Sequence, residues 1–171
     1  AAHETKNSAW GLGLENYVIL LDWNDFGIDD PSHSSVVHGD PRSWFEPYGW
    51  RVAGTDDATD FASLVRAYAA ILNDTDKNGR PGLVYARNRK GRGYGVYDNK
   101  SHGTAHKPNS DLFWNTKREF QEKYDVRFEG FGQPAPKDAA AFAAQTRANI
   151  DRVIDVMRRD SDLVTFVAGR L

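Results

Sequence analysis

A strand, a helix and a second strand follow one another in the middle of the chain, and this order constrains the fold most. Residues 50–55 and 82–86 have the short apolar character of buried strands. Between them, apolar residues recur at the three- and four-residue spacing of one helical face: Phe61, Leu64, Val65, Tyr68, Ile71 and Leu72. Strand, crossover helix and strand make up the right-handed unit of parallel sheets. The sequence therefore predicts an α/β fold, with a parallel sheet and flanking helices.

Residues 17–22 form another short apolar run, which suits a strand covered on both faces. Asp56 and Asp57 precede the central helix as candidates for its N-cap, and Asp60 is expected in its first turn. That helix is expected to end near Asn73, before a polar stretch. No apolar run approaches the roughly 20 residues needed to span a bilayer, so we expect no membrane partner.

Two more helices are expected in the second half of the chain. One covers residues 111–124 with Ser110 as its N-cap, and the other covers about residues 137–159. The later helix carries an apolar stripe suited to packing on another surface: Phe142, Thr146, Ile150, Val153 and Met157. Two long irregular segments, 22–49 and 87–109, separate these elements, and long loops of this kind often carry function.

The composition limits the classes of function. The 171 residues include 22 Lys+Arg and 24 Asp+Glu, a formal net charge of −2, so any attraction for an anion must be local. Hydrophobic residues make up 40% and charged residues 27%, as in ordinary globular domains. The chain has no cysteine, which excludes disulfides, thiolate zinc sites and cysteine nucleophiles. This is compatible with the cytoplasm, where we expect the protein to reside.

The segment Asp-Trp-Asn-Asp-Phe-Gly-Ile-Asp-Asp, residues 22–30, leaves the end of the first predicted strand. Ligands of open α/β sheets bind at the carboxyl ends of the strands. Asn24 and the loop carbonyls offer the hard oxygen ligands that Mg²⁺ or Ca²⁺ prefers. The spacing of the acids does not match an EF-hand. A polar turn stabilised by local hydrogen bonds accounts for the same residues, and the segment alone does not decide between the two interpretations.

The stretch 87–107 contains six Lys and Arg residues, one acid (Asp98), and glycines that let backbone N–H groups approach an anion. Three interpretations stay open from composition. The stretch is a solvated loop, a phosphate-binding loop, or a surface for single-stranded nucleic acid with Tyr94 and Tyr97 as stacking platforms. His102 and His106 are candidates for titration near neutral pH, but neither has a partner at the spacing of a zinc site.

Four segments, in this order, resemble transketolases: Leu-Glu-Asn-Tyr-Val-Ile-Leu-Leu-Asp-Trp-Asn (14–24), Tyr-Gly-Trp-Arg-Val (48–52), Gly-Arg-Pro-Gly-Leu-Val-Tyr-Ala-Arg-Asn-Arg-Lys-Gly-Arg-Gly (79–93) and Asn-Lys-Ser-His-Gly (99–103). They are similar to the strand leading into the family's metal loop, an aromatic-Gly-Trp strand start, a strand with a basic glycine loop, and a His-Gly loop. The resemblance implies that residues 1–130 are part of the domain that binds the diphosphate side of thiamine diphosphate. Residues 131–171 are expected to be a helical extension of that domain or a linker.

The resemblance also implies roles for particular residues. Asn24 would give a side-chain oxygen, and Phe26 its backbone carbonyl, to Mg²⁺ (or Ca²⁺). Ile28 would make an apolar contact with thiamine diphosphate. His102 would contact the diphosphate or the sugar-phosphate substrate and is the candidate catalytic residue. Glu4 falls where the family has an acid near its subunit interface.

The implied activity is transfer of a two-carbon ketol unit between sugar phosphates by a homodimeric transferase, with the carbanion chemistry supplied by the cofactor. The chain does not begin with Met, and we expect the family's Gly-Asp-Gly metal motif to be encoded upstream of it. The pyrimidine-binding domain is also missing from this sequence. We therefore expect an excised fragment that is inactive alone, exposes apolar surface and tends to associate. The chain has Asp30-Pro31 where the family usually has Gly after Ile-Asp.

Two alternatives remain from the sequence. One is another thiamine diphosphate enzyme, of the deoxyxylulose-phosphate synthase or oxoacid dehydrogenase type, which differs in its substrate. The other is a non-catalytic module that binds RNA or another polyanion through the basic loop 87–107. The second alternative predicts salt-dependent oligonucleotide binding that does not respond to thiamine diphosphate. We do not expect a nucleic-acid partner.

Overall fold

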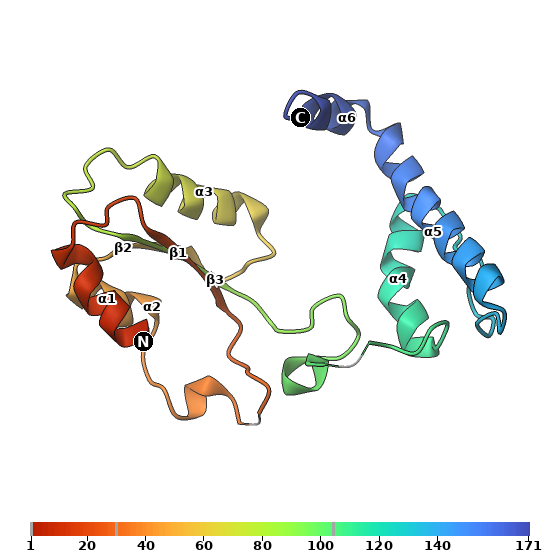
Figure 1. Ribbon diagram of the computed structural model, residues 1–171, viewed down its shortest axis with the longest axis horizontal. Coiled ribbons are helices and arrows are strands. Elements are labelled where there is room, and N and C mark those ends of the chain that lie inside the picture. The colour runs from red at the N-terminus through yellow and green to blue at the C-terminus, as the bar shows by residue number, and fades with distance from the viewer. Residues whose placement is uncertain (1, 30, 104) are drawn as a thin grey trace. The chain divides into compact units, whose positions relative to one another are not determined.

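The computed structural model describes residues 2–29, 31–103 and 105–171 (Figure 1). Asp30, the last acid of the predicted metal loop, lies outside the described residues. The chain divides into two compact units. Residues 1–92 and 96–102 form the first, which we call the sheet unit, and residues 93–95 and 103–171 form the second, the helical unit. The predicted division at residue 130 concerns the domains of the family and stays a prediction.

The sheet unit is built on three parallel strands in the order β1-β3-β2. These are β1 (Val18–Trp23), β2 (Arg51–Thr55) and β3 (Gly82–Arg87). Helix α3 (Phe61–Leu72) joins β2 to β3, as the apolar periodicity predicts. In the sheet, Asp22 is level with Ala86, and so is Thr55, so all three strands end at one edge. The predicted α/β class, with a parallel sheet and flanking helices, is confirmed.

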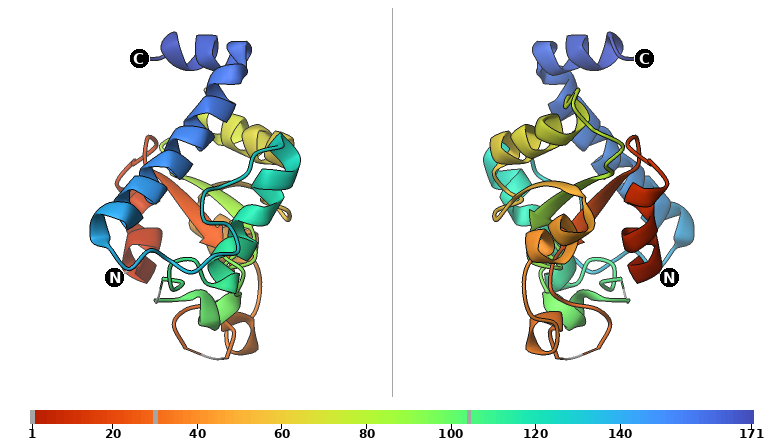
Figure 2. Two further views of the ribbon diagram at one scale, coloured as in Figure 1. Left: turned by 90° about the vertical axis from the view of Figure 1, so that its right-hand side faces the viewer. Right: turned by 90° about the vertical axis from the view of Figure 1, so that its left-hand side faces the viewer.

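Helices cover both faces of this sheet (Figures 1 and 2). Helices α1 (Ala2–Gly11) and α2 (Pro41–Phe45) lie on one side, where Ala9, Trp50 and Leu83 form a buried cluster. Helix α3 lies on the other side, where its Ala67 and Ile71 pack against the strands. The central strand β3 is therefore covered twice, which explains its continuously apolar sequence.

Short polar caps set the ends of the helices in this unit. The Asp60 carboxylate accepts a hydrogen bond from the Ser63 backbone N–H at 3.0 Å and is the N-cap of α3. The prediction of Asp56 or Asp57 as this cap is wrong, because Asp57 instead accepts from the Thr59 N–H in the preceding turn. Between the strands run the 3₁₀ turns η1 (His33–Ser35) and η2 (Glu46–Tyr48), and η3 (Asp98–Ser101) follows β3.

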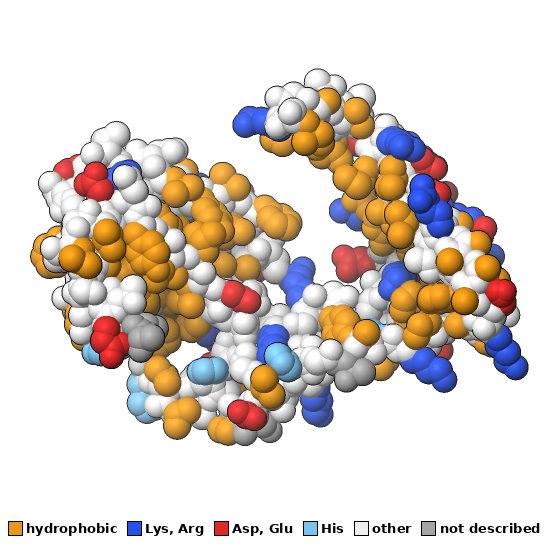
Figure 3. Space-filling model, viewed as in Figure 1, with side chains coloured by type: hydrophobic (Ala, Val, Ile, Leu, Met, Phe, Trp, Pro, Cys, Tyr) orange, Lys and Arg blue, Asp and Glu red, His pale blue; other side chains and the backbone are white. Residues whose placement is uncertain are grey.

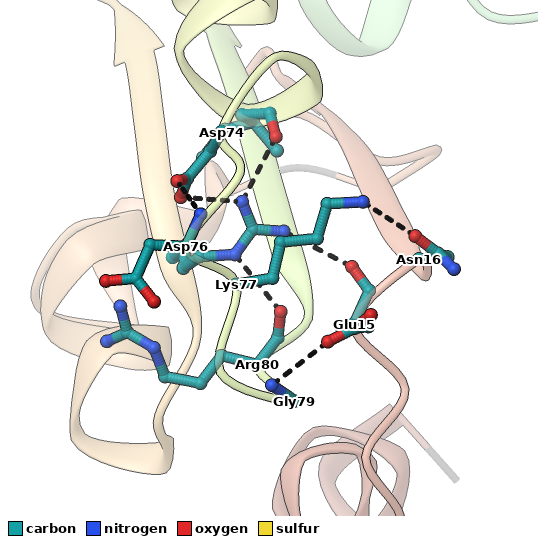
Figure 4. A network of polar contacts seen from close by, with 9 residues as sticks. Glu15, Asn16, Asp74, Asp76, Lys77, Gly79 and Arg80 are labelled. Carbon is teal, nitrogen blue, oxygen red and sulfur yellow. Dashed lines mark hydrogen bonds and ion pairs between the residues drawn. The ribbon is translucent and has the colours of Figure 1, made fainter.

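A buried arginine at the start of β2 connects the end of α3 to the chain before β1 (Figure 4). Arg51 is only 6% exposed, and its guanidinium donates to the backbone carbonyls of Ile71, Arg80 and Glu15. It also forms an ion pair with Asp74 at 3.0 Å. The backbone N–H of Asp76, and then Arg51, hold the pKa of Asp74 below its usual range. The network fixes the amino edge of the sheet, opposite the edge where ligands bind.

Large apolar side chains lie exposed on the α3 side of the sheet unit (Figure 3). Leu20 of β1 is 59% exposed, and three residues of α3 are exposed to a similar or greater extent: Phe61, Val65 and Leu72 are 76%, 65% and 56% exposed. This agrees with the predicted exposure of apolar surface, while the predicted association stays a prediction.

The helical unit contains α4 (Asp111–Tyr124), α5 (Ala139–Arg159) and α6 (Ser161–Ala168). Ser110 is the N-cap of α4, as predicted, and α5 begins two residues later than predicted because Asp138 caps it. Trp114 is buried on α4, and Phe131, in the loop that follows, lies 5.3 Å from its ring. Within the described residues, none of the helices has the length and apolar character needed to cross a membrane.

Candidate functional site

Polar side chains from β1 and β3 meet at the carboxyl edge of the sheet. The Asp22 carboxylate accepts a hydrogen bond from Asn88 Nδ2 through Oδ1 and one from Asn24 Nδ2, at 3.0 Å, through Oδ2. The Asn88 backbone N–H also lies 3.4 Å from the Trp23 carbonyl. One carboxylate thus holds the tips of two adjacent strands together and orients the amide of Asn24.

Asn24 lies directly beyond β1, and its side chain is half-buried rather than packed in the core. Its Oδ1 accepts the backbone N–H of Phe26 at 3.0 Å, which bends the chain into a tight turn. With its amide nitrogen on Asp22 and its amide oxygen facing the turn, Asn24 has one fixed orientation. The turn also sets the position of the Phe26 carbonyl, the second predicted metal ligand.

The loop after this turn folds back through Asp25. Its carboxylate accepts from the backbone N–H and the hydroxyl of Ser34, both at 2.7 Å, and its carbonyl accepts from the His33 N–H. Burial raises the pKa of Asp25, but the two hydrogen bonds from Ser34 outweigh it and hold the pKa below its usual range. Asp25 has a φ of 71°, a left-handed conformation that Asp adopts more readily than most residues.

A cavity of about 290 Å³ opens beside this loop, on the side of the sheet covered by α2. Its aromatic walls are Trp23, Phe26 and Trp44, and Asn24 and His33 also line it. The Arg87 guanidinium lies 4.5 Å from the Trp23 ring, a cation–π contact at the end of β3. The cavity therefore combines apolar walls with a few polar groups at the strand ends, as ligand sites usually do.

Lys90 joins the loop after β1 to the loop after β3. Its ammonium donates to the Gly27 carbonyl and lies 3.5 Å from His102 Nδ1. This contact brings His102, which is exposed, to the same edge as Asn24 and Phe26. Ile28, the residue after Gly27, is 65% exposed and has room to touch a ligand.

A second cavity, of about 420 Å³, lies on the other side of Asp22. Thr59, Phe61 and residues 88–92 line it. Of its cations, Arg89 is already paired with Asp98 at 3.0 Å and lies 4.2 Å from the Tyr97 ring. The pKa of Arg89 is raised by its hydrogen bonds to Asp98.

The structure thus brings Asn24, Phe26 and His102 to one edge and leaves other candidates elsewhere. His106 belongs to the helical unit, where its ring stacks on Tyr94 with a centroid distance of 4.2 Å. Glu4 lies in the first turn of α1. The hydrogen bonds that Asp22, Asn88 and Lys90 make at this edge were not predicted from the sequence. Asp22 ends the first predicted strand, and Asn88 lies two residues beyond the predicted strand 82–86. Their positions at strand ends were the signal that could have identified both.

The oxygen donors at this edge fit part of a divalent-metal site. Asn24 Oδ1 and the Phe26 carbonyl are hard neutral ligands, and the Asp22 carboxylate holds the amide nitrogen of Asn24. Among the described residues, no group of three or more His, Cys, Asp or Glu side chains is placed to hold a metal ion. A metal here would take its other ligands from water, from the phosphates of a ligand or from further protein. Mg²⁺ commonly binds with such a mixed set of ligands.

The sequence matches a family model over residues 1–151, that of the transketolase thiamine diphosphate binding domain. Transketolase 2 of Xanthobacter flavus is 26% identical over 175 residues, which cover 87% of this chain and 25% of that protein. The chain thus spans about a quarter of the length of this curated relative.

Solved transketolases share the fold. The Pichia stipitis enzyme in complex with sedoheptulose 7-phosphate superimposes with a TM-score of 0.57 at 21% identity, over 98% of this chain and 23% of that one. The Campylobacter jejuni enzyme gives 0.57 at 16% identity, over 96% of this chain and 25% of that one. The family match, over most of the chain, and the parallel sheet lead to one conclusion: this chain belongs to the family of transketolase thiamine diphosphate-binding domains.

Proposed function

We propose that the chain provides the diphosphate and metal side of the cofactor site in a transketolase-type transferase. The observation that carries this proposal is the Asn24–Asp22–Asn88 arrangement at the carboxyl edge of the sheet, with Lys90 and His102 beside it. These groups come from both strand ends, and each is held by a neighbour. Such preorganised polar groups at a strand-end crevice suit a charged ligand.

Asn24 Oδ1 and the Phe26 carbonyl would hold the divalent metal, Mg²⁺ or Ca²⁺. To do so, the amide oxygen of Asn24 would share its lone pairs between the Phe26 N–H and the ion. Asp22 orients the Asn24 amide from its nitrogen side, which leaves the oxygen directed away from the carboxylate. Thiamine diphosphate, when bound, supplies the carbanion chemistry of the reaction.

Lys90 and His102 would complement the diphosphate. The Lys90 ammonium is fixed by the Gly27 carbonyl, so its positive charge stays near the loop that carries Ile28. His102 is exposed and presents its other ring nitrogen to a ligand or to a sugar phosphate. In this proposal His102 donates a hydrogen bond to an anionic oxygen, and Ile28 makes an apolar contact with the cofactor.

The substrates and partners of the whole enzyme follow from the same proposal. We infer sugar phosphates as substrates, transfer of a two-carbon ketol unit, a cytoplasmic location, and a homodimer completed by the remaining transketolase domains. The chain spans about a quarter of its curated relative, and we expect no turnover from it alone. Among thiamine diphosphate enzymes, the match to transketolases supports this activity over a deoxyxylulose-phosphate synthase or an oxoacid dehydrogenase.

The polyanion-binding alternative has less support. Asp98 pairs with Arg89, and Lys90 is engaged by Gly27, so fewer cations of the basic loop are available to a phosphate backbone. Tyr94 stacks on His106 rather than presenting a free face on that side. Oligonucleotide binding that weakens with salt and is lost in the triple variant Arg89→Ala, Lys90→Ala, Arg92→Ala would favour this alternative.

The proposal is tested by calorimetric titration of the chain with thiamine diphosphate in the presence and absence of Mg²⁺. We expect Mg²⁺ to strengthen binding, and Asn24→Ala to remove most of that Mg²⁺ dependence. Asn115→Ala is the matched control, because Asn115 is an exposed asparagine of α4 whose side chain accepts a hydrogen bond from Arg118. If Asn24→Ala left the Mg²⁺ dependence unchanged, Asn24 would not be a metal ligand.

A further inference from the structure

The helical unit contains an apolar cavity of its own, between α4 and α5. Its volume is about 290 Å³, close to the lower end of the range of about 300–1,000 Å³ usual for ligand sites. Its walls are apolar side chains from both helices and the loop that joins them: Phe113, Phe128, Phe142, Ile150, Val153 and Ile154. Ile150 is 51% exposed, so the cavity opens to solvent along α5, where Figure 3 shows apolar side chains gathered.

The amide side chains at the cavity are already satisfied. Gln145 Nε2 donates to Asn109 Oδ1 at 3.0 Å, and Asn109 Nδ2 donates to the Gln133 carbonyl at 3.2 Å. Asn149 accepts from the Glu129 N–H at 2.7 Å and donates to its carbonyl at 3.1 Å. These bonds tie α5 to Asn109, just before α4, and to the loop after α4, so the cavity is held open by groups that need no ligand.

Lys117 is different, because no acidic side chain among the described residues pairs with its ammonium. It is the one charged side chain among the described residues that line the cavity. Its ammonium donates to the Phe113 carbonyl at 3.2 Å and to the Thr116 hydroxyl at 3.1 Å, and it lies 3.6 Å from the centroid of the Phe113 ring. None of the ion pairs among the described residues includes Lys117. Burial lowers the pKa of Lys117, as expected for an ammonium near apolar walls.

We propose that this cavity binds a small carboxylate with an apolar body, such as a medium-chain fatty acid. The carboxylate would pair with Lys117, and the apolar chain would lie against Phe142, Ile150 and Val153. Charge complementarity selects the carboxylate, because a neutral ligand would leave the partly desolvated ammonium without a counter-charge. The apolar walls select the rest of the ligand. The site lies wholly in the helical unit and does not depend on the proposed cofactor site.

Two probes of equal chain length test the proposal: octanoate, and octanol as its neutral counterpart. Each is titrated into the full chain by calorimetry. We expect octanoate to bind roughly tenfold more tightly than octanol, as one charge-assisted hydrogen bond suggests. Lys117→Met should bring octanoate down to the affinity of octanol. Lys123→Met is the matched control, because Lys123 lies on the same helix, 5.2 Å from the Tyr124 ring and outside the cavity, and it should keep the preference.

A second measurement needs only the unmodified chain, so it holds even if Lys117→Met does not fold. Saturating octanoate should raise the pKa of Lys117, followed by NMR of its side-chain carbon next to the ammonium, while octanol should not. The proposal is overturned if octanoate and octanol bind equally, if Lys123→Met removes the preference, or if octanoate leaves the pKa of Lys117 unchanged. A dimer in sedimentation, together with no binding of either probe, would also overturn the proposal. A second copy of the chain would then be the occupant of the cavity.

Discussion

The two units of this chain differ in how much charge pairing they contain in their interiors. In the sheet unit, polar and charged side chains are paired across elements far apart in sequence, as in the Arg51–Asp74 ion pair and the Asp22–Asn88 hydrogen bond. In the helical unit, neutral amides make most of the long-range polar contacts, with Arg152–Glu129 as a more exposed ion pair. No ion pair among the described residues includes the partly buried Lys117. The difference teaches that polar groups set the geometry of the sheet unit, whereas the helical unit depends more on apolar packing.

The residues with implied cofactor and metal roles also lie in one unit only. Every residue with an implied cofactor or metal role, Asn24, Phe26, Ile28 and His102, belongs to the sheet unit. The family match extends through residue 151 and so includes most of the helical unit. The helical unit therefore belongs to the same family region without contributing to the predicted cofactor contacts. Substitutions in one unit should affect a different property from those in the other.

The largest effect is expected for Arg51→Met in the sheet unit. The change leaves three backbone carbonyls without their buried donor, and each buried polar group left unsatisfied costs about 1–3 kcal/mol. Urea denaturation combined with hydrogen exchange should show lost protection in β2, β3 and α3, with the helical unit unchanged. Arg66→Met is the control, because Arg66 is exposed and its ion pair with Asp60 is long, at 4.0 Å. Equal losses of hydrogen-exchange protection in both units would contradict the separation of the sheet unit from the helical unit.

A smaller effect, confined to the helical unit, is expected for Asn109→Ala. Asn109 is 8% exposed and bonds both Gln145 and the Gln133 carbonyl, so its loss should cost about 1–3 kcal/mol. Asn109 also has a φ of 58°, which alanine tolerates poorly. Asn109→Gly separates the two causes, because glycine removes the amide but accepts the backbone conformation. Hydrogen exchange of α4 and α5 measures the loss. A loss in β1–β3 instead would contradict the separation of the units.

The capping box of α2 should be worth less. Asp40 accepts from the Ser43 N–H at 3.0 Å, and the Ser43 hydroxyl accepts from the Asp40 N–H at 2.9 Å. Asp40→Ala should therefore cost about 1 kcal/mol. Asp40→Asn, which keeps an acceptor, should cost clearly less. Thermal unfolding followed by circular dichroism compares the two variants, and equal losses would mean that the cap does not act through this bond.

The smallest effect concerns pH and Asp25. Its pKa is lower in the folded chain than in the unfolded one, so its stabilisation is present above the unfolded pKa of about 3.9 and is lost as the pH falls through the folded pKa. Asp25→Asn should be slightly less stable than the unmodified chain near neutral pH, and the gap should close in acid. Denaturation at several pH values measures the gap. A gap that widens in acid would mean that the pKa of Asp25 is raised on folding.

Much of the sheet unit was predictable from local sequence. The apolar periodicity gave α3 the bounds that the structure has, and the apolar runs located all three strands to within one residue of each end. Helix α2 was missed because it is only five residues long, although Asp40-Pro41 carries the signal of an N-cap followed by proline. Helix α1 has little amphipathic pattern, and α6 begins directly beyond the capping Asp160, so neither stood out.

The site was predictable only in part, because its contacts join distant residues. Asn24 was found from its position at a strand end, but its bond to Asp22 and the bond from Asn88 need the register of β1 against β3. Lys90 was recognised only as one of several cations. Its contacts with Gly27 and His102 depend on how two irregular loops fold, which no local pattern encodes. The resemblance to transketolases supplied the roles that local chemistry could not.

The most direct test of the central claim is a residue-resolved NMR titration of the chain with Mg²⁺ and thiamine diphosphate, and with thiamine as the control. The account predicts that thiamine diphosphate shifts the amide signals of residues 22–28, 88–92 and His102 and leaves those of residues 109–168 unchanged. Thiamine should shift neither set of signals. Shifts confined to the helical unit, or none at Asn24, Asn88 and His102, would contradict the assignment of the cofactor site to this edge of the sheet.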